Sequence, residues 1–354
     1  MEMANINRDD IDSIYAGMLS PDIFEHQSHA APGIPDYLAL NNIPSTRVEA
    51  ACASGGLASL HGIIGVGSGL FDTVLSVGAE KMTNLPTSHI TEALAMCADD
   101  IYEVSSGITF PGAFAMMARA HEREFGTNAE MRASVAVKAH KNALDNEVAQ
   151  FRKEITIEKA VNSLMIADPL TLYDCSPITD GAAALIIVPW EKAKKFDGPK
   201  VKIRSFAQAS DMMSLHDRTD FTGFVTTKIA ARKAFERANL QPKDIDFVEV
   251  HDCFTIAEIM AIEDLGFFEK GKGGQVTIDG ETAVDGHLPV NASGGLKAKG
   301  HPIGATGVSQ IVEVFKQLND MAGKRQLSDV NLGMTQNLGG SGSTIVCHIL
   351  ERGN

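Results

Sequence analysis

Residues 48–78 read VEAACASGGLASLHGIIGVGSGLFDTVLSVG and place a cysteine, Cys52, between a strand-like segment and a glycine-rich run. Glycine costs about 1 kcal/mol relative to alanine inside a helix, so a helix here must pack too closely against its neighbours for larger side chains. We expect this helix to be buried. At its N-terminal end, unpaired N–H groups and the helix dipole should lower the pKa of the Cys52 thiol toward a reactive thiolate. A small buried cysteine that only fills space is the alternative.

The fold class follows from alternation along the chain. Short aliphatic runs such as AALIIVP (183–189) and STIVCHIL (343–350) alternate with helical patterns such as VTTKIAARKAFERANL (225–240). This order predicts an α/β fold, in which helices cover sheets of buried and mostly parallel strands.

Two pairs of segments repeat in the same order along the chain. INRDDIDSIYAGML (6–19) resembles LQPKDIDFVEVHDC (240–253), and ITDGAAALIIVPWEK (178–192) resembles GGSGSTIVCHILERG (339–353). The repetition predicts a duplicated protein whose halves are residues 1–195 and 196–354. The first half would also carry an inserted loop region at about 82–165.

The repeat leaves one expected segment unaccounted for. The second half has a strand near 201–208 and a helix near 225–240 before its DID tripeptide, whereas only nine residues precede the DID of the first half. Roughly 35 to 45 residues of the repeat are missing there. We therefore expect the natural gene to continue upstream of Met1 with a strand and a helix, and this chain alone to be poorly soluble or weakly active.

Composition excludes several classes of protein. The net charge is −14 and the 31 Lys and Arg residues are scattered, which argues against a nucleic-acid surface. There is no apolar run of about 18 residues and no signal-like start, so we expect a cytoplasmic protein without membrane contact. The five cysteines are far apart and show no CxxC spacing, so free thiols are expected and no metal site.

Two further stretches carry groups suited to catalysis. In NASGGLKAKGHPIGATGVSQIVEVFKQL (291–318), His301 lies in a glycine-rich turn that leads into an amphipathic helix. In VEVHDCFTIAEIMA (248–261), a strand ends in His251, Asp252 and Cys253. Such positions suit a general base or an oxyanion donor, because active sites of α/β proteins usually lie at the carboxyl ends of strands.

Four of these motifs together resemble the thiolase family: EAACASGG, HDCF, GHPIGATG and NLGGSG occur in that order over nearly the whole chain. HDCF is similar to the motif of the sterol carrier protein type and its archaeal relatives. The resemblance implies a five-layer α/β/α/β/α fold made of two halves, with two buried central helices. The first half would lack its N-terminal strand and helix.

The resemblance also implies an acetyl-CoA C-acetyltransferase with defined residue roles. Cys52 would attack acetyl-CoA and carry the acetyl group, while His301 takes the proton of its thiol. Cys253 would be the acid and base of the condensation step. Many thiolases take this second cysteine from a CxG motif near the end of the chain, but here Asn337 occupies that position.

Oxyanion stabilisation and substrate contacts complete the implied site. His251 and His301 would form one oxyanion hole, and the backbone N–H groups of Cys52 and Gly339 a second. Candidate substrate-binding residues are Asn291 and Ser293, for which a turn-forming role is the alternative, and Arg218 and Lys228 for the phosphates of coenzyme A.

The implied substrates are acetyl-CoA and coenzyme A, without a cofactor. By resemblance, the chain should form a homodimer or a dimer of dimers, and its partners would include hydroxymethylglutaryl-CoA synthase and a zinc-bearing OB-fold protein. Three alternatives stay open: a ketoacyl-synthase-like condensing enzyme, a hydroxymethylglutaryl-CoA synthase, and a non-catalytic thiolase-fold subunit. The first needs one cysteine and two histidines but no second cysteine.

Overall fold

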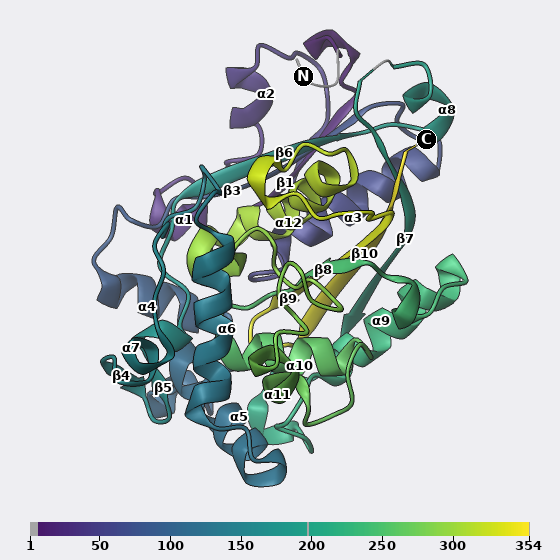
Figure 1. The fold of residues 1–354 in the computed structure, drawn as a ribbon. Coiled ribbons are helices and arrows are strands. Elements are labelled where there is room, and N and C mark those ends of the chain that lie inside the picture. Colours follow the sequence, from purple (N-terminus) through teal and green to yellow (C-terminus); the bar gives the residue numbers. More distant parts are fainter. Residues whose placement is uncertain (1–5, 197, 354) are drawn as a thin grey trace.

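The computed structural model describes residues 6–196 and 198–353 and contains, within them, two four-stranded sheets (Figure 1). Their strand orders are β2-β1-β3-β6 and β7-β10-β9-β8. The first sheet consists of β1 (Ser13–Gly17), β2 (Ser45–Val48), β3 (Val74–Glu80) and β6 (Gly181–Ile187). The second consists of β7 (Val201–Ser210), β8 (Phe247–Glu249), β9 (Leu332–Gly339) and β10 (Thr344–Arg352).

Helices separate and cover the two sheets. Helices α3 (Ser54–Gly67) and α12 (Ile303–Leu318) lie side by side between the sheets (Figure 1). Helices α9 (Val225–Ala238) and α10 (Thr255–Asp264) pack on the second sheet from outside, and the short α2 (Gly33–Tyr37) packs on the first. The chain therefore has the expected α/β/α/β/α order of layers.

The last aspartate of each DID tripeptide makes equivalent hydrogen bonds in the two sheets. Asp12 Oδ2 accepts hydrogen bonds of 2.9 and 2.8 Å from the two backbone N–H groups just before β3. Asp246 Oδ2 accepts bonds of 2.7 and 2.8 Å from the two N–H groups that begin β9. In both sheets the DID strand is parallel to the strand it anchors, and the next strand is antiparallel. This equivalence agrees with the predicted duplication.

The two sheets differ at one edge. The strand and helix predicted near 201–208 and 225–240 are confirmed as β7 and α9, and β7 pairs antiparallel with β10 along its whole length. Beside β6, which corresponds to β10, no strand lies among residues 6–196 and 198–353. At the other edge β2 pairs with β1, whereas the second sheet has only a bridge from Val248 to Val290.

The insertion of the first half runs from the end of β3 to the start of β6, and so extends beyond the predicted boundary near 165. It contains α4 (Thr87–Ala95), α5 (Phe110–Phe125), α6 (Ala129–Asn142), α7 (Ile157–Val161) and the hairpin of β4 (Met165–Ala167) and β5 (Leu170–Thr171). The remaining α-helices are α1 (Pro21–Phe24), α8 (Trp190–Ala193) and α11 (Gly273–Ile278). The predicted domain boundary at 195/196 falls between α8 and β7.

The central helices touch through glycine backbones. A Cβ atom on Gly55 of α3 would overlap the carbonyl oxygen of Gly304 in α12, and one on Gly307 of α12 would overlap the backbone of Gly56. A Cβ on Gly17 of β1 would lie only 2.6 Å from Gly55 Cα, and real Cβ contacts are longer. The prediction that glycines permit unusually close helix packing is therefore confirmed.

Candidate active site

The predicted nucleophile and both histidines meet at the N-terminal ends of the two central helices. Cys52 precedes α3, His301 precedes α12, and His251 follows β8. One ligand-type atom from each of these side chains lies within 4.8 Å of the others. The two imidazole rings lie edge to face, with centroids 4.9 Å apart and planes at 87°. Three segments distant in the sequence thus form one cluster.

The turn that presents Cys52 is held in an uncommon conformation. Ala51 has a φ of 50°, in the left-handed region that residues with a side chain rarely adopt. The hydroxyl of Ser54 stabilises this turn, since it accepts from the Ala50 N–H at 3.0 Å and donates to the Ala51 carbonyl at 2.6 Å. Strained backbone of this kind often occurs at functional sites, where it fixes a reactive side chain.

The resting thiol of Cys52 is protonated, which corrects the expectation from the helix N-terminus. Burial raises the pKa of Cys52 to about 12. The backbone N–H of Gly340, which faces the sulfur, lowers this pKa but by less than burial raises it. The nearby carboxylate of Glu80 raises this pKa further. Loss of hydration therefore outweighs the helix dipole. The N–H that contacts the sulfur belongs to Gly340, next to the predicted oxyanion donor Gly339.

Both histidines are neutral in this site. Burial lowers the pKa of His301 to about 3, and burial together with His301 lowers the pKa of His251 well below its usual value. A neutral thiol therefore faces neutral imidazoles, not a preformed thiolate–imidazolium pair. The proton of Cys52 has to leave during attack on an electrophile, with an imidazole as the acceptor.

This charge state predicts how Cys52 reacts with iodoacetamide as pH changes. Because the folded pKa is raised to about 12, the thiolate fraction should grow roughly tenfold per pH unit between pH 6 and 9, without a plateau. Peptide mapping after timed alkylation would measure the rate at Cys52 separately from the other four cysteines. A plateau in this range would instead reveal a thiolate stabilised by a charged histidine.

The turn with His301 is anchored to both halves. His301 Nδ1 lies 2.7 Å from Thr306 Oγ1, one turn into α12. The backbone N–H of His301 donates to Thr179 Oγ1 at 3.0 Å. Glu80, at the end of β3, accepts from the Gly304 N–H in the first turn of α12 at 3.0 Å. The imidazole is therefore fixed relative to the first sheet as well as to its own helix.

The HDCF loop is fixed by its neighbours. The backbone N–H of His251 donates to Gln336 Oε1 at 3.0 Å, and His251 Nδ1 lies 3.1 Å from Asn337 Nδ2. The carbonyl of Cys253 accepts from the Ser176 N–H at 2.9 Å. Burial raises the pKa of Cys253 well above its usual value, and the nearby Cys52 adds to this. Both cysteines therefore rest as thiols.

Asn291 and Ser293, predicted to bind substrate, are turned inward. Asn291 Oδ1 accepts from the Val250 N–H at 2.8 Å, and its Nδ2 donates to Glu258 at 2.9 Å. The Ser293 hydroxyl donates to Glu249 at 2.5 Å. Both residues are 0% exposed, so no polar atom of either faces an open space. Their alternative role, holding the loops around His251 and His301, accounts for these contacts.

The two cations proposed for coenzyme A phosphates also have protein partners. Arg218 donates to the Ser341 carbonyl at 2.6 Å and to the Ser341 hydroxyl at 3.0 Å, so it stabilises the loop that contains Gly340. Lys228 Nζ lies 3.4 Å from Asp264. Arg218 therefore has a structural use that the sequence did not suggest, and contact of either residue with phosphate remains a prediction.

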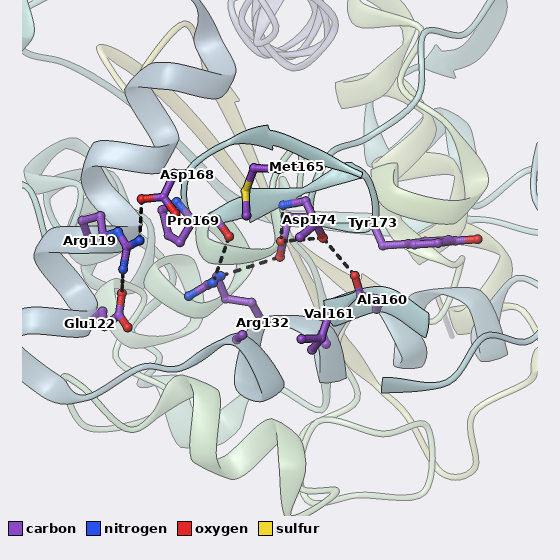
Figure 2. Close-up of a pocket in the computed structure, with 13 residues that line it drawn as sticks. Arg119, Glu122, Arg132, Ala160, Val161, Met165, Asp168, Pro169, Tyr173 and Asp174 are labelled. Carbon is purple, nitrogen blue, oxygen red and sulfur yellow. Dashed lines mark hydrogen bonds and ion pairs between the residues drawn. The ribbon is translucent and has the colours of Figure 1, made fainter. Parts of the chain in front are cut away.

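A cavity of about 250 Å³ lies in the insertion (Figure 2). Its lining residues, including Arg132 and Asp174, come from α5, α6, α7 and the segment around β4 and β5. Asp174 accepts a hydrogen bond from the hydroxyl of Thr255, two residues after Cys253. Neither Cys52 nor Cys253 lines this cavity, so it is separate from the catalytic cluster but supports one of its loops.

Sequence reasoning missed three supporting residues of this site. Thr306 lies in the GHPIGATG motif itself, where its distance of five residues from His301 along a helix could have suggested contact. Asn337 was noted only as a replacement for cysteine. Glu80 ends a hydrophobic strand, and a carboxylate at such a buried position was an available signal.

Comparisons with known proteins identify the family of the chain. The thiolase N-terminal domain model matches residues 1–191, and the thiolase C-terminal domain-like model matches residues 207–352. An acetyl-CoA acetyltransferase of Methanothermobacter thermautotrophicus is 51% identical over 352 residues, which cover 99% of this chain and 91% of that protein. An acetyl-CoA acetyltransferase of Methanocaldococcus jannaschii is 44% identical over 358 residues, again 99% and 91% of the two chains.

A solved structure agrees at the level of the fold. The Ltp2-ChsH2(DUF35) aldolase superposes with a TM-score of 0.85 at 23% sequence identity, over 99% of this chain and 89% of that one. Matches to both domain models, a relative of 51% identity over nearly the full length and the glycine-packed central helices agree. The chain belongs to the thiolase family.

Proposed function

We propose that this chain is an acetyl-CoA C-acetyltransferase that joins two molecules of acetyl-CoA into acetoacetyl-CoA and free coenzyme A, or catalyses the reverse thiolysis. The observation that carries the proposal is the cluster of Cys52, His251 and His301 within 4.8 Å, where the two halves meet. The 51% identity to an acetyl-CoA acetyltransferase supports the choice of substrate.

In the first half-reaction the sulfur of Cys52 attacks the thioester carbonyl of acetyl-CoA. His301 takes the thiol proton as the carbon–sulfur bond forms, because both groups are neutral beforehand. The tetrahedral oxyanion is stabilised by backbone N–H donors of Cys52 and the 339–340 loop. Coenzyme A leaves as a thiolate and receives the proton from His301, so that acetyl-Cys52 remains.

In the second half-reaction Cys253 removes a proton from the methyl carbon of a second acetyl-CoA. The resulting enolate oxygen accepts hydrogen bonds from Nε2 of His251 and from Nε2 of His301, which has by then taken up the proton of the Cys253 thiol. The enolate carbon attacks the carbonyl of acetyl-Cys52. The Cys52 thiolate leaves and takes this proton from His301, which releases acetoacetyl-CoA and returns all three groups to their resting states. Because burial raises the pKa of Cys253, its thiol must pass its proton to His301 before it can act as this base, and thiolysis uses the same groups in reverse.

Locating the acetyl group tests this function. The protein is incubated with acetyl-CoA labelled in its acetyl carbons, quenched in acid and digested, and the modified peptide is identified by mass. We expect the label on Cys52. Cys347, which is 0% exposed inside β10, is the internal control that should stay unlabelled. Label on another cysteine, or on none, would contradict the proposed nucleophile.

We predict that Cys253→Ala separates the two half-reactions. Acetyl transfer to Cys52 should change less than about tenfold, while condensation should fall by roughly 10² to 10⁴, the usual contribution of a general acid or base. The burst of acetylation measures the first half-reaction, and the rate of acetoacetyl-CoA formation measures the second. Cys175→Ala is the matched control, since this partly buried thiol bonds only to the Thr171 carbonyl at 3.5 Å.

The same variant distinguishes the ketoacyl-synthase-like alternative. A condensing enzyme of that kind relies on one cysteine and two histidines, and would keep its carbon–carbon bond formation without Cys253. Condensation by Cys253→Ala at the rate of the unmodified protein would therefore favour the alternative. A non-catalytic subunit would show neither half-reaction, and the full-length identity to acetyl-CoA acetyltransferases disfavours it.

The proposed assembly and setting follow the family. We expect no cofactor beyond the coenzyme A of the substrates, and a homodimer or a dimer of dimers, because two-fold contacts are the commonest symmetric interfaces. Sedimentation as a 37.8 kDa monomer would contradict this. Hydroxymethylglutaryl-CoA synthase and a zinc-bearing OB-fold protein remain proposed partners by resemblance. The described residues form no helix suited to spanning a membrane, and a cytoplasmic setting is proposed for the five free thiols.

A further inference from the structure

We propose that Asn337 is a positioning residue that fixes the proton of His251 on Nε2, and so makes this imidazole a hydrogen-bond donor to substrate. The inference rests on the proposed function, because the donor would serve the enolate of the second acetyl-CoA. It assigns a role to the asparagine that occupies the place of a cysteine in many thiolases.

The amide of Asn337 has only one orientation that satisfies its neighbours. Its Oδ1 accepts from the backbone N–H of Gly56 at 3.1 Å, and a backbone N–H can only donate. Its Nδ2 lies 3.0 Å from the carbonyl oxygen of Cys52, which can only accept. These two partners, the carbonyl of the nucleophile itself and an N–H in the first turn of α3, hold the NH₂ group toward His251.

This orientation decides the tautomer of His251. Asn337 Nδ2 lies 3.1 Å from His251 Nδ1 and cannot accept a hydrogen bond, so Nδ1 must be the unprotonated nitrogen. The ring is neutral, and its single proton therefore lies on Nε2. His251 Nε2 is buried and has no hydrogen-bond partner among the described residues. A buried N–H without a protein partner is suited to an oxyanion.

The neighbouring His301 carries the opposite tautomer. Thr306 donates its one hydroxyl proton to the Pro302 carbonyl at 3.0 Å, so its oxygen accepts from His301 Nδ1 at 2.7 Å. His301 Nε2 is then unprotonated and can accept the proton of Cys52. One imidazole is prepared as a base and the other as a donor, although both are buried in the same cluster. The difference comes from Thr306 and Asn337.

The assignment also bears on metal binding at this cluster. Cys52, His251 and His301 are close enough to hold an ion. A histidine that binds a metal must present an unprotonated nitrogen to it, with the other nitrogen donating to an outer partner. Asn337 imposes the reverse arrangement on His251. The geometry therefore favours an oxyanion over a cation at His251 Nε2.

Nuclear magnetic resonance of the unmodified protein tests the tautomer without any need for activity. With ¹⁵N-histidine labelling, long-range proton–nitrogen correlations separate protonated from unprotonated ring nitrogens, and the His251 signals are identified by their loss in His251→Gln. We expect Nδ1 of His251 to be unprotonated and Nε2 to be protonated. In Asn337→Asp, which is nearly the same size, an accepting oxygen replaces the NH₂ group, so Nδ1 should become protonated.

Kinetics test the consequence. Asn337→Leu removes the donor to His251 Nδ1 and should lower condensation by about 10² to 10³, the usual effect of losing one oxyanion donor. Acetyl transfer to Cys52 should fall less than about tenfold. The matched controls are Asn331→Leu and Asn331→Asp, at an exposed asparagine just before β9. These should change neither half-reaction.

Two results would overturn the inference. One is a His251 that carries its proton on Nδ1 in the unmodified protein, or that keeps Nδ1 unprotonated in Asn337→Asp. The other is an equal loss of both half-reactions in Asn337→Leu, which would show that Asn337 only holds the Cys52 turn. If the unmodified protein transferred no acetyl group, the proposed function would fail while the tautomer measurement would still decide the role of Asn337.

Discussion

Cys52→Ala is expected to abolish acetyl exchange and acetoacetyl-CoA formation together, by on the order of 10⁴-fold or more in kcat. Both half-reactions make or break a bond to this sulfur, so no other step can compensate. The remaining histidines and backbone donors could still bind acetyl-CoA. We therefore expect binding of coenzyme A, measured by calorimetry, to change much less than kcat.

A neighbouring cysteine provides the control for this prediction. Cys97 is partly buried and packs in the same apolar cluster as Cys52, and its pKa is also raised, first by burial and then by Cys52. Cys97→Ala removes a thiol from the same apolar cluster, but this thiol does not belong to the group formed by Cys52, His251 and His301. It should retain most of the activity. Activity that survives in Cys52→Ala and disappears in Cys97→Ala would show that the nucleophile has been assigned to the wrong cysteine.

Gly307→Ala is expected to cost roughly 3 kcal/mol or more of the free energy of unfolding. The added methyl group would overlap the backbone nitrogen of Gly56 and the side-chain oxygen of Asn337, neither of which is the free end of a flexible side chain. The two helices must separate, and Cys52 and His301 move apart with them. Chemical denaturation would measure the loss of stability. The amplitude and rate of the acetylation burst would measure how far the separation of Cys52 and His301 impairs acetyl transfer.

Gly67→Ala is the matched control within the same pair of helices. Gly67 ends α3, and a Cβ atom there would meet nothing within 4 Å. Because alanine favours the helix by up to about 1 kcal/mol relative to glycine, this change should stabilise the protein or leave it unchanged. If both substitutions had the same effect, close contact between the helices would not explain the glycines.

The proposed catalytic residues could be located in the sequence because each lies in a short motif with local meaning. Cys52 and His301 precede glycine-rich helices, and His251 and Cys253 follow a strand, so local periodicity placed them at the ends of elements. The fold class was predictable for the same reason. The DID repeat indicated the two halves, and Asp12 and Asp246 indeed anchor corresponding strands.

What the sequence did not predict depends on contacts between distant segments. The direction of the Cys52 pKa was wrong because the helix N-terminus is a local feature, whereas burial comes from the whole fold. For Asn291 and Ser293, which precede the turn with His301, the sequence left substrate binding and a turn-forming role equally open. In the structure, Ser293 donates a hydrogen bond to the buried carboxylate of Glu249, and Asn291 donates one to the buried carboxylate of Glu258. Spacing along the chain shows none of these partners.

The contact between α3 and α12 determines when a nascent chain can become reactive. Cys52 is synthesised early, whereas its base His301 and the amide of Asn337 come near the end of translation. N-terminal segments begin to fold as they leave the ribosome, but both of these neighbours of Cys52 belong to the second half. The thiol therefore stays inactive on the ribosome. Catalysis starts only when the second half has been made and has docked its glycine helix against the first.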